Sequence, residues 1–203
     1  MLKTAADYSE KNIVAVTNKF KSLLQSVERP GMSDLIAWLE STDFFDAPAS
    51  TRFHGSFKHG LMLHSYAVYT HMELLCDTYY KEVQLPRTDS NIVCALLHDA
   101  CKADVYVPGT RNVKDDKTGE WKKVDTYTFE DKLPYGHGEK SVYLISKFIE
   151  LEEAEAMAIR WHMGAYDSTA KGGSYAVSDS FALHPYAMLL HFADECACKI
   201  TGV

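Results

Sequence analysis

A histidine and an aspartate, His98 and Asp99, stand side by side where an apolar stretch of the sequence stops. The stretch runs from Asn91 to Leu97, and Lys102 follows three residues after the aspartate. A helix this apolar is normally interior, and an interior imidazole and carboxylate must be neutralised, hydrogen-bonded or bound to a metal ion. Neighbouring residues on a helix point about 100° apart, so both side chains reach one point only where a helix ends. The pair therefore predicts a metal centre at a helix end.

Further histidine and aspartate residues stand alone in apolar or glycine-bounded contexts, each in a different expected helix. They are His64, His137, His162 and Asp194. Helical bundles build metal sites by projecting such side chains inward from several helices. Imidazole and carboxylate ligands without thiolate favour Mn²⁺, Fe²⁺, Co²⁺, Ni²⁺ or Zn²⁺ over Mg²⁺. We therefore expect one or two divalent transition-metal ions, held by these residues together with His98 and Asp99.

Several basic side chains are candidates to contact an anionic substrate near this centre. Lys102 is the first candidate, because it lies one helical turn from the His-Asp pair. Arg52 and His54 share an irregular segment, Arg111 lies in an expected hairpin, and Lys140 lies at an expected helix start. Taken alone, each of these four is more often an ordinary surface or loop residue than a substrate contact.

The elements expected to position these residues are mostly helical. Apolar periodicity and breaker residues predict helices over about residues 9–27, 33–39, 61–80, 91–102, 138–149, 152–163 and 186–199. Residues 104–130 alternate instead around a turn at 115–119, which predicts a β-hairpin inserted over 104–134. Residues 165–180 are polar and rich in Gly and Ser, which is typical of a mobile loop. We predict one mostly α domain over residues 1–203, with the N-terminal helices of residues 9–40 packed on it.

The composition limits the function classes. A chain of 203 residues that is 46% hydrophobic and 24% charged is ordinary for one globular domain. A net charge of −7 argues against a general nucleic-acid coat. The sequence has no run of about 18 apolar residues and no apolar core in residues 1–7, so we expect neither a membrane partner nor a signal peptide. Five cysteines without a C-x-x-C pair are typical of free thiols, which predicts a cytoplasmic protein.

The order of the motifs resembles one known family. The segments that carry the resemblance are Ala47-Pro48-Ala49, Gly60-Leu61-Met62-Leu63-His64-Ser65, Leu96-Leu97-His98-Asp99, Gly136-His137, His162-Met163-Gly164 and Ala193-Asp194. Their order, H…HD…H…H…D, resembles that of the HD-domain metal-dependent phosphohydrolases with two metal ions. It looks most similar to the HD domain of the bacterial 3′–5′ exoribonucleases. The resemblance covers about residues 44–199 and implies an HD-type helical bundle.

The resemblance also implies roles for single residues. It implies a first metal ion held by His64, His98, Asp99 and Asp194. It implies that Asp99 bridges to a second ion held by His137 and His162. Many relatives have a second consecutive histidine where this chain has Met163, and often a glutamate where it has Leu63. The exoribonucleases also carry a separate OB-fold for RNA, and this chain has no room for one.

The leading functional prediction is hydrolysis of a phosphoester in a nucleotide or a short oligonucleotide, with monoester and diester both open. Two metal ions can hold a bridging hydroxide as the nucleophile, which Asp99 would orient while Lys102 neutralised the phosphate. The expected partner is a small phosphoester such as a nucleotide, or short single-stranded RNA or DNA. The hairpin and residues 165–180 are positioned to close over it. The oligomeric state is not predicted.

Three other functions stay open at this point. Di-iron oxygenases of the same superfamily share the six ligands, although hydrolysis is favoured. A nucleotide-binding module that has lost catalysis would not need every ligand to be present. A helical scaffold without any site would leave six convergent ligand residues unexplained.

Overall fold

The computed structural model describes residues 8–79 and 81–203. Its α-helices are α1 (Glu10–Gln25), α2 (Met32–Ser41), α3 (Gly60–Thr78), α4 (Ser90–Leu97), α5 (Gly138–Ile145), α6 (Glu153–Trp161), α7 (Ser168–Lys171), α8 (Ala176–Leu183) and α9 (Pro185–Cys196). Its strands are β1 (Tyr106–Lys114) and β2 (Trp121–Phe129). The predicted mostly α fold with one hairpin is confirmed. The expectations for residues 1–7 and for Tyr80, where one predicted helix ended, lie outside the described residues.

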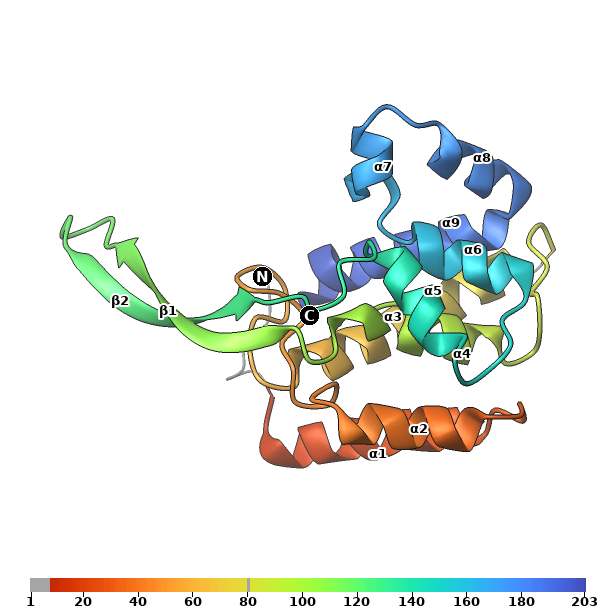
Figure 1. Cartoon of the computed structure of the whole chain (residues 1–203), viewed down its shortest axis with the longest axis horizontal. Coiled ribbons are helices and arrows are strands. Elements are labelled where there is room, and N and C mark those ends of the chain that lie inside the picture. Colours follow the sequence, from red (N-terminus) through yellow and green to blue (C-terminus); the bar gives the residue numbers. More distant parts are fainter. Residues whose placement is uncertain (1–7, 80) are drawn as a thin grey trace.

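The hydrophobic core lies between α3, α4, α6 and α9, which pack on one another in the body of the molecule (Figure 1). Leu61 of α3, Leu96 of α4 and Leu190 of α9 are fully buried in it. Helices α1 and α2 add Phe20 and Leu35 to the same core cluster. They form a layer below the other helices in Figure 1. The apolar faces predicted from helical periodicity are therefore the faces that the fold buries.

A buried ionic network joins the N-terminal layer to the body. Arg29, between α1 and α2, is bonded to Asp89 at 2.6 Å and to Glu155 at 2.5 Å. Glu155 is fully buried in α6, and its carboxylate also accepts a hydrogen bond from the Ser90 hydroxyl at 2.6 Å. Because Arg29 carries several donors in one fixed plane, it serves both carboxylates at once. The network therefore fixes the α1–α2 junction against the starts of α4 and α6.

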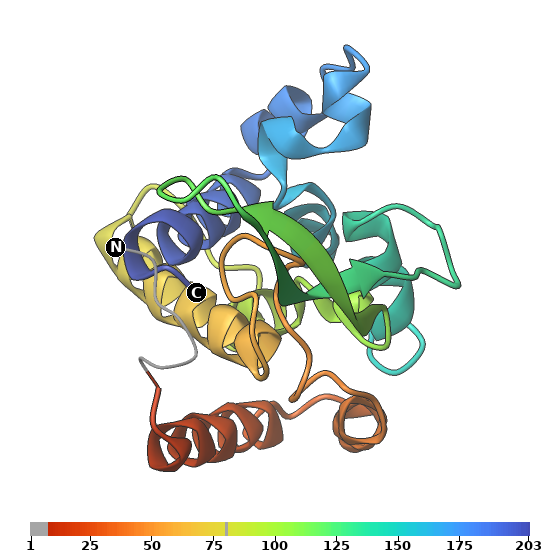
Figure 2. The ribbon, with the colours of Figure 1, turned by 90° about the vertical axis from the view of Figure 1, so that its left-hand side faces the viewer.

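The hairpin projects from the helical body (Figures 1 and 2), and besides its root Thr126 in the middle of β2 contacts the segment before α3, where its hydroxyl donates to the carbonyl oxygen of Thr51 at 2.9 Å. Its strands pair antiparallel, from Tyr106 opposite Phe129 at the root to Lys114 opposite Trp121 near the turn. The Tyr106 hydroxyl donates to the carbonyl oxygen of Ala49 at 3.2 Å. The root is thereby anchored to the irregular segment that precedes α3.

The predicted mobile loop over residues 165–180 is wrong, because most of that segment is helical. It forms α7 and the first half of α8, which lie above the body in Figure 1. The Asp167 side chain caps α7, because it accepts a hydrogen bond from the backbone N–H of Thr169 at 2.8 Å. The same carboxylate forms an ion pair with Arg160 at 3.0 Å. The polar residues that suggested a solvated loop therefore include a helix cap.

No helix among residues 8–79 and 81–203 is long and apolar enough to cross a membrane.

Candidate metal centre

The six predicted ligand residues come from different elements and meet inside the helical body. His64 lies in α3, His98 directly after α4, Asp99 next to it, His137 directly before α5, His162 directly after α6, and Asp194 in α9. All are buried except His137, whose side chain is 31% exposed. Helix α4 ends at Leu97 and a short 3₁₀ turn follows from Ala100. The helix end predicted from His98-Asp99 is therefore present, a few residues earlier than the apolar pattern indicated.

Asp99 lies between two pairs of imidazoles and presents one carboxylate oxygen to each. Its Oδ2 is 3.4 Å from His98 Nε2 and 3.6 Å from His64 Nε2. Its Oδ1 is 2.8 Å from His137 Nε2 and 3.6 Å from His162 Nε2. A carboxylate in this position can ligate two ions at once, one through each oxygen. Asp99 therefore faces both pairs of imidazoles at once.

The imidazoles of three of these histidines are oriented by backbone carbonyls. The Nδ1–H group of His64 donates to Val203 O at 2.9 Å, that of His98 to Ala95 O at 2.8 Å, and that of His162 to Ile159 O at 2.7 Å. Because a carbonyl oxygen only accepts, each Nδ1 carries the hydrogen and each Nε2 keeps its lone pair. This is the orientation that metal-binding histidines commonly have.

The Nε2 atoms face a common centre with no donor of their own. His64 Nε2 and His98 Nε2 are 3.3 Å apart, and both are acceptors in this tautomer. His162 Nε2 is buried and has no hydrogen-bond partner among the described residues. Converging lone pairs repel one another, and burial without a partner is unfavourable. A divalent cation resolves both problems, so the donor set fits a metal ion.

The charges around the centre also favour a cation. Burial opposes ionisation of Asp99, but Lys102 and the surrounding imidazoles hold its pKa well below the usual range. Burial likewise opposes ionisation of Asp194, and the nearby imidazoles of His64, His98 and His162 nevertheless keep its pKa low. Lys102 donates to Asp99 Oδ2 at 2.6 Å, and this carboxylate raises the pKa of the lysine in spite of burial. The environment of both carboxylates therefore favours their ionised form.

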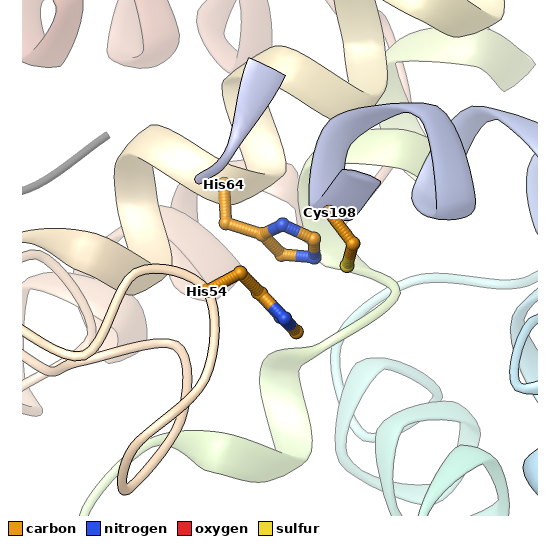
Figure 3. Close-up of side chains that lie close together, drawn as sticks. All are labelled: His54, His64 and Cys198. Atoms are coloured by element: carbon orange, nitrogen blue, oxygen red, sulfur yellow. The ribbon is translucent and has the colours of Figure 1, made fainter. Parts of the chain in front are cut away.

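His54 and Cys198 flank the side of the centre that contains His64 (Figure 3). The rings of His54 and His64 are 4.8 Å apart between centroids, and burial lowers the pKa of His54 to about 3. The Cys198 thiol donates to Asp194 Oδ1 at 3.5 Å. His54, proposed from the sequence as a substrate contact, thus lies beside a predicted ligand as a neutral imidazole.

Two cysteines, expected from the sequence to be ordinary free thiols, lie beside the centre. Cys101 Sγ lies 3.4 Å from His137 Nδ1 and belongs to a buried group with Asp99. Burial raises the pKa of the Cys101 thiol to about 12. Their spacing in the sequence could have indicated this position, because Cys101 follows the predicted ligand Asp99 by two residues and Cys198 follows Asp194 by four. Thiols therefore lie beside both halves of the centre.

The remaining candidate substrate contacts divide into two groups. Lys102 and Lys140 line a pocket of about 330 Å³ beside His137, which we call the hairpin-root pocket. Lys140 is buried and pairs with Asp131 at 2.5 Å, so its charge is already compensated.

Arg52 and Arg111 lie at the surface and are not among the residues that line this pocket. The Arg52 guanidinium lies 5.2 Å from the centre of the Phe53 ring, on the segment that precedes α3. Arg111 lies on β1 opposite Val124, and its side chain is exposed. Neither residue is therefore brought to the metal centre or to the hairpin-root pocket.

The HD-domain family model matches residues 62–198, which is more than half of the chain. The protein therefore belongs to the HD-domain family, whose members bind divalent metals and are generally metal-dependent hydrolases. Neither the search of curated proteins nor the search of solved structures found a match to this chain. The match begins just before His64 and includes every residue of the predicted ligand set.

Proposed function

We propose that this protein is a metal-dependent phosphohydrolase that acts on a phosphoester of a nucleotide or short oligonucleotide. The observation that carries the proposal is the set of converging Nε2 lone pairs around Asp99, which needs a cation to be stable. Family membership supports the reaction class. One or two ions of Mn, Fe, Co, Ni or Zn suit these imidazole and carboxylate donors better than Mg.

Metal ions at such a site supply Lewis-acid polarisation of a phosphoryl oxygen and activate the attacking water. The protein's own contribution is orientation and charge. Asp99 is fixed by the imidazoles on both of its oxygens, so it aligns the two halves of the centre. Lys102 borders the hairpin-root pocket, where its ammonium is placed to neutralise a phosphate. Its pairing with Asp99 also fixes the ammonium before substrate arrives.

The substrate would enter through the hairpin-root pocket, because this opening borders both His137 and Lys102. Arg52 and Arg111 would then serve as outer phosphate contacts if the substrate is a short single strand of RNA or DNA. The net charge of −7 favours a small substrate over a long polyanion.

The proposal is tested with full-length protein purified without chelator. Its metals are measured by elemental analysis, and it is then incubated with nucleoside mono-, di- and triphosphates, cyclic nucleotides and short RNA. We expect release of phosphate or nucleoside without oxygen when Mn²⁺, Co²⁺ or Ni²⁺ is supplied. Asp99→Asn should lose both activity and bound metal, whereas Asp116→Asn at the hairpin turn should retain both.

Two results would contradict the proposal. One is the absence of hydrolysis on the whole panel with each of the three metals present. The other is turnover that requires O₂ in an iron-loaded protein, which would make the protein an oxygenase of the same superfamily. Ligand binding that survives in Asp99→Asn without any wild-type turnover would instead indicate a nucleotide-binding module.

A further inference from the structure

The hairpin-root pocket has a different chemical character at each end. His137 and Lys102 border it on the side of the metal centre. Tyr106 and Phe129 line it where the two strands leave the body, and Asp131 and Lys140 also lie on its wall. A ligand that reaches the metal centre through this opening must therefore place its remaining atoms against the hairpin root.

The hairpin root presents an aromatic wall to this pocket. Tyr106 and Phe129 are direct cross-strand partners, with ring centroids 5.7 Å apart and planes inclined by 67°. The hydrogen bond from the Tyr106 hydroxyl to the Ala49 carbonyl oxygen holds the Tyr106 ring in place, while Phe129 remains 56% exposed. An exposed aromatic ring beside a pocket is free to stack on a planar group, and such stacking contributes about 1–3 kcal/mol for each nucleobase.

The polar part of the wall is electrically neutral. Lys140 and Asp131 pair at 2.5 Å, and both side chains are largely buried. The pair therefore adds no net charge to this wall. The Asp131 carboxylate has lone pairs on both oxygens and can still accept a hydrogen bond from an amino or hydroxyl group. This wall therefore suits the uncharged part of a ligand.

We propose that the hairpin-root pocket binds the nucleoside part of the substrate. The base stacks on Phe129, an amino or hydroxyl group donates to Asp131, and the phosphate points toward Lys102 and His137. The inference rests on the proposed function for the position of the phosphate. It adds the nucleobase as the feature that the pocket selects and makes Phe129 the residue that determines this selectivity.

Binding rather than turnover tests the proposal. The probes are methylenephosphonate analogues of the four ribonucleoside 5′-monophosphates, in which carbon replaces the bridging ester oxygen and prevents hydrolysis. The same phosphonate of ribose, which lacks a base, is the reference ligand. Affinities are measured calorimetrically on full-length Mn²⁺-loaded protein, for the wild type, Phe129→Ala and Trp121→Ala. Trp121 is the matched control, because it is an exposed aromatic residue on the same strand at the far end of the hairpin.

We expect at least one nucleoside analogue to bind about tenfold or more tightly than the ribose phosphonate, as base stacking predicts. Phe129→Ala should remove this advantage and leave the affinity for the ribose phosphonate unchanged, while Trp121→Ala should behave like the wild type. Equal affinity of all five ligands for the wild type would overturn the inference, and so would an unchanged advantage in Phe129→Ala.

Failure of the inference and failure of the proposed function give different results. If the ribose phosphonate binds as well as the nucleoside analogues and phosphoesters are hydrolysed, only the nucleobase selectivity is wrong. If nucleoside analogues bind through Phe129 but no phosphoester is hydrolysed, the pocket is correct and the catalytic proposal is wrong.

Discussion

Asp99 determines how the histidines of this protein can act together. One of its oxygens faces His64 and His98, and the other faces His137 and His162. An isolated buried carboxylate would be protonated, because burial disfavours its charge. Here the surrounding donors and Lys102 keep it ionised. The residue is therefore prepared to bind cations before any cation is present.

Lys102 is expected to act on the substrate rather than on assembly of the centre. Replacing it as Lys102→Met should reduce kcat about 100- to 1000-fold, the usual effect of removing one group that stabilises developing charge. Bound metal should not decrease, because the substitution removes a positive charge beside the ligands. Steady-state kinetics and elemental analysis of the same preparation measure both quantities.

The control for this substitution is Lys122→Met, which changes an exposed lysine of the hairpin. It should leave kcat and metal content unchanged. Loss of metal in Lys102→Met would show that the lysine supports the geometry of Asp99 instead of contacting the phosphate.

At the scale of elements, the close approach of α5 and α6 brings His137 near His162. Their ring centroids are 5.1 Å apart. Gly138, the first residue of α5, lies directly against the carbonyl oxygen of Arg160 in α6, so any Cβ at this position would collide with backbone. The glycine is required for contact rather than for an unusual backbone angle. It permits the two helix ends to place both imidazoles on one side of Asp99.

Gly138→Ala should therefore separate the two histidines and weaken the metal position between them. We expect its affinity for Mn²⁺ to fall about tenfold or more, the range seen when ligand orientation is disturbed. Calorimetric titration of chelator-treated protein measures the affinity. Gly172→Ala is the control, because a Cβ there would lie no closer than 3.3 Å to other atoms. Equal affinities in the two variants would contradict this role of Gly138.

The Arg29 network predicts a pH dependence of stability. The hydrogen bond from Arg29 lowers the pKa of Asp89 below its usual value. Since the folded pKa is below the unfolded one, the contribution is complete above the unfolded pKa of about 3.9 and is lost as the pH falls through the folded pKa. Asp89→Asn should lower the free energy of unfolding by about 1.5–3 kcal/mol at neutral pH.

Urea unfolding at about pH 7 and about pH 3 measures this dependence, since the unfolded carboxylate is mostly protonated only below its pKa. The difference between Asp89→Asn and the wild type should shrink at the lower pH. Glu28→Gln, which changes an exposed neighbour of Arg29, should show little difference at either pH. A constant difference for Asp89→Asn would mean that its charge is not involved.

At the scale of the whole molecule, the metal centre links five helices that are distant in the sequence. Its residues lie in or directly beside α3, α4, α5, α6 and α9. An ion bound there interacts with the folded chain and not with a single unfolded segment. Such an ion stabilises the fold by about 2.7 kcal/mol when its free concentration is a hundred times Kd.

Removal of metal should therefore lower Tm. For a chain of this size, each kcal/mol corresponds to about 2–4 °C, so a drop of about 5–10 °C is expected in excess chelator. Differential scanning calorimetry measures the shift, and Mn²⁺ in excess of the chelator should restore Tm. Asp99→Asn should respond less to chelator than the wild type. An identical Tm with and without chelator would contradict a structural contribution of the ion.

The class of fold and the residues that meet at the centre could be predicted from the amino-acid sequence alone. Helical periodicity indicated the apolar faces, and alternation around the turn at 115–119 indicated the hairpin. His98 and Asp99 were detectable as an adjacent pair at the end of an apolar run, and the other four ligand residues as lone polar residues in apolar or glycine-bounded segments. Such local signals depend on few neighbours, and burying an unpaired imidazole or carboxylate is unfavourable anywhere in a protein.

The contacts that these residues make became known only from the folded structure. It divided the two oxygens of Asp99 between two pairs of imidazoles, placed Cys101 and Cys198 beside the centre, and neutralised Lys140 with Asp131. It also put most of residues 165–180 into helices. These features depend on the directions of side chains from helices far apart in the sequence. A one-dimensional pattern gives the face on which a residue lies, but not the partner that another element brings to that face.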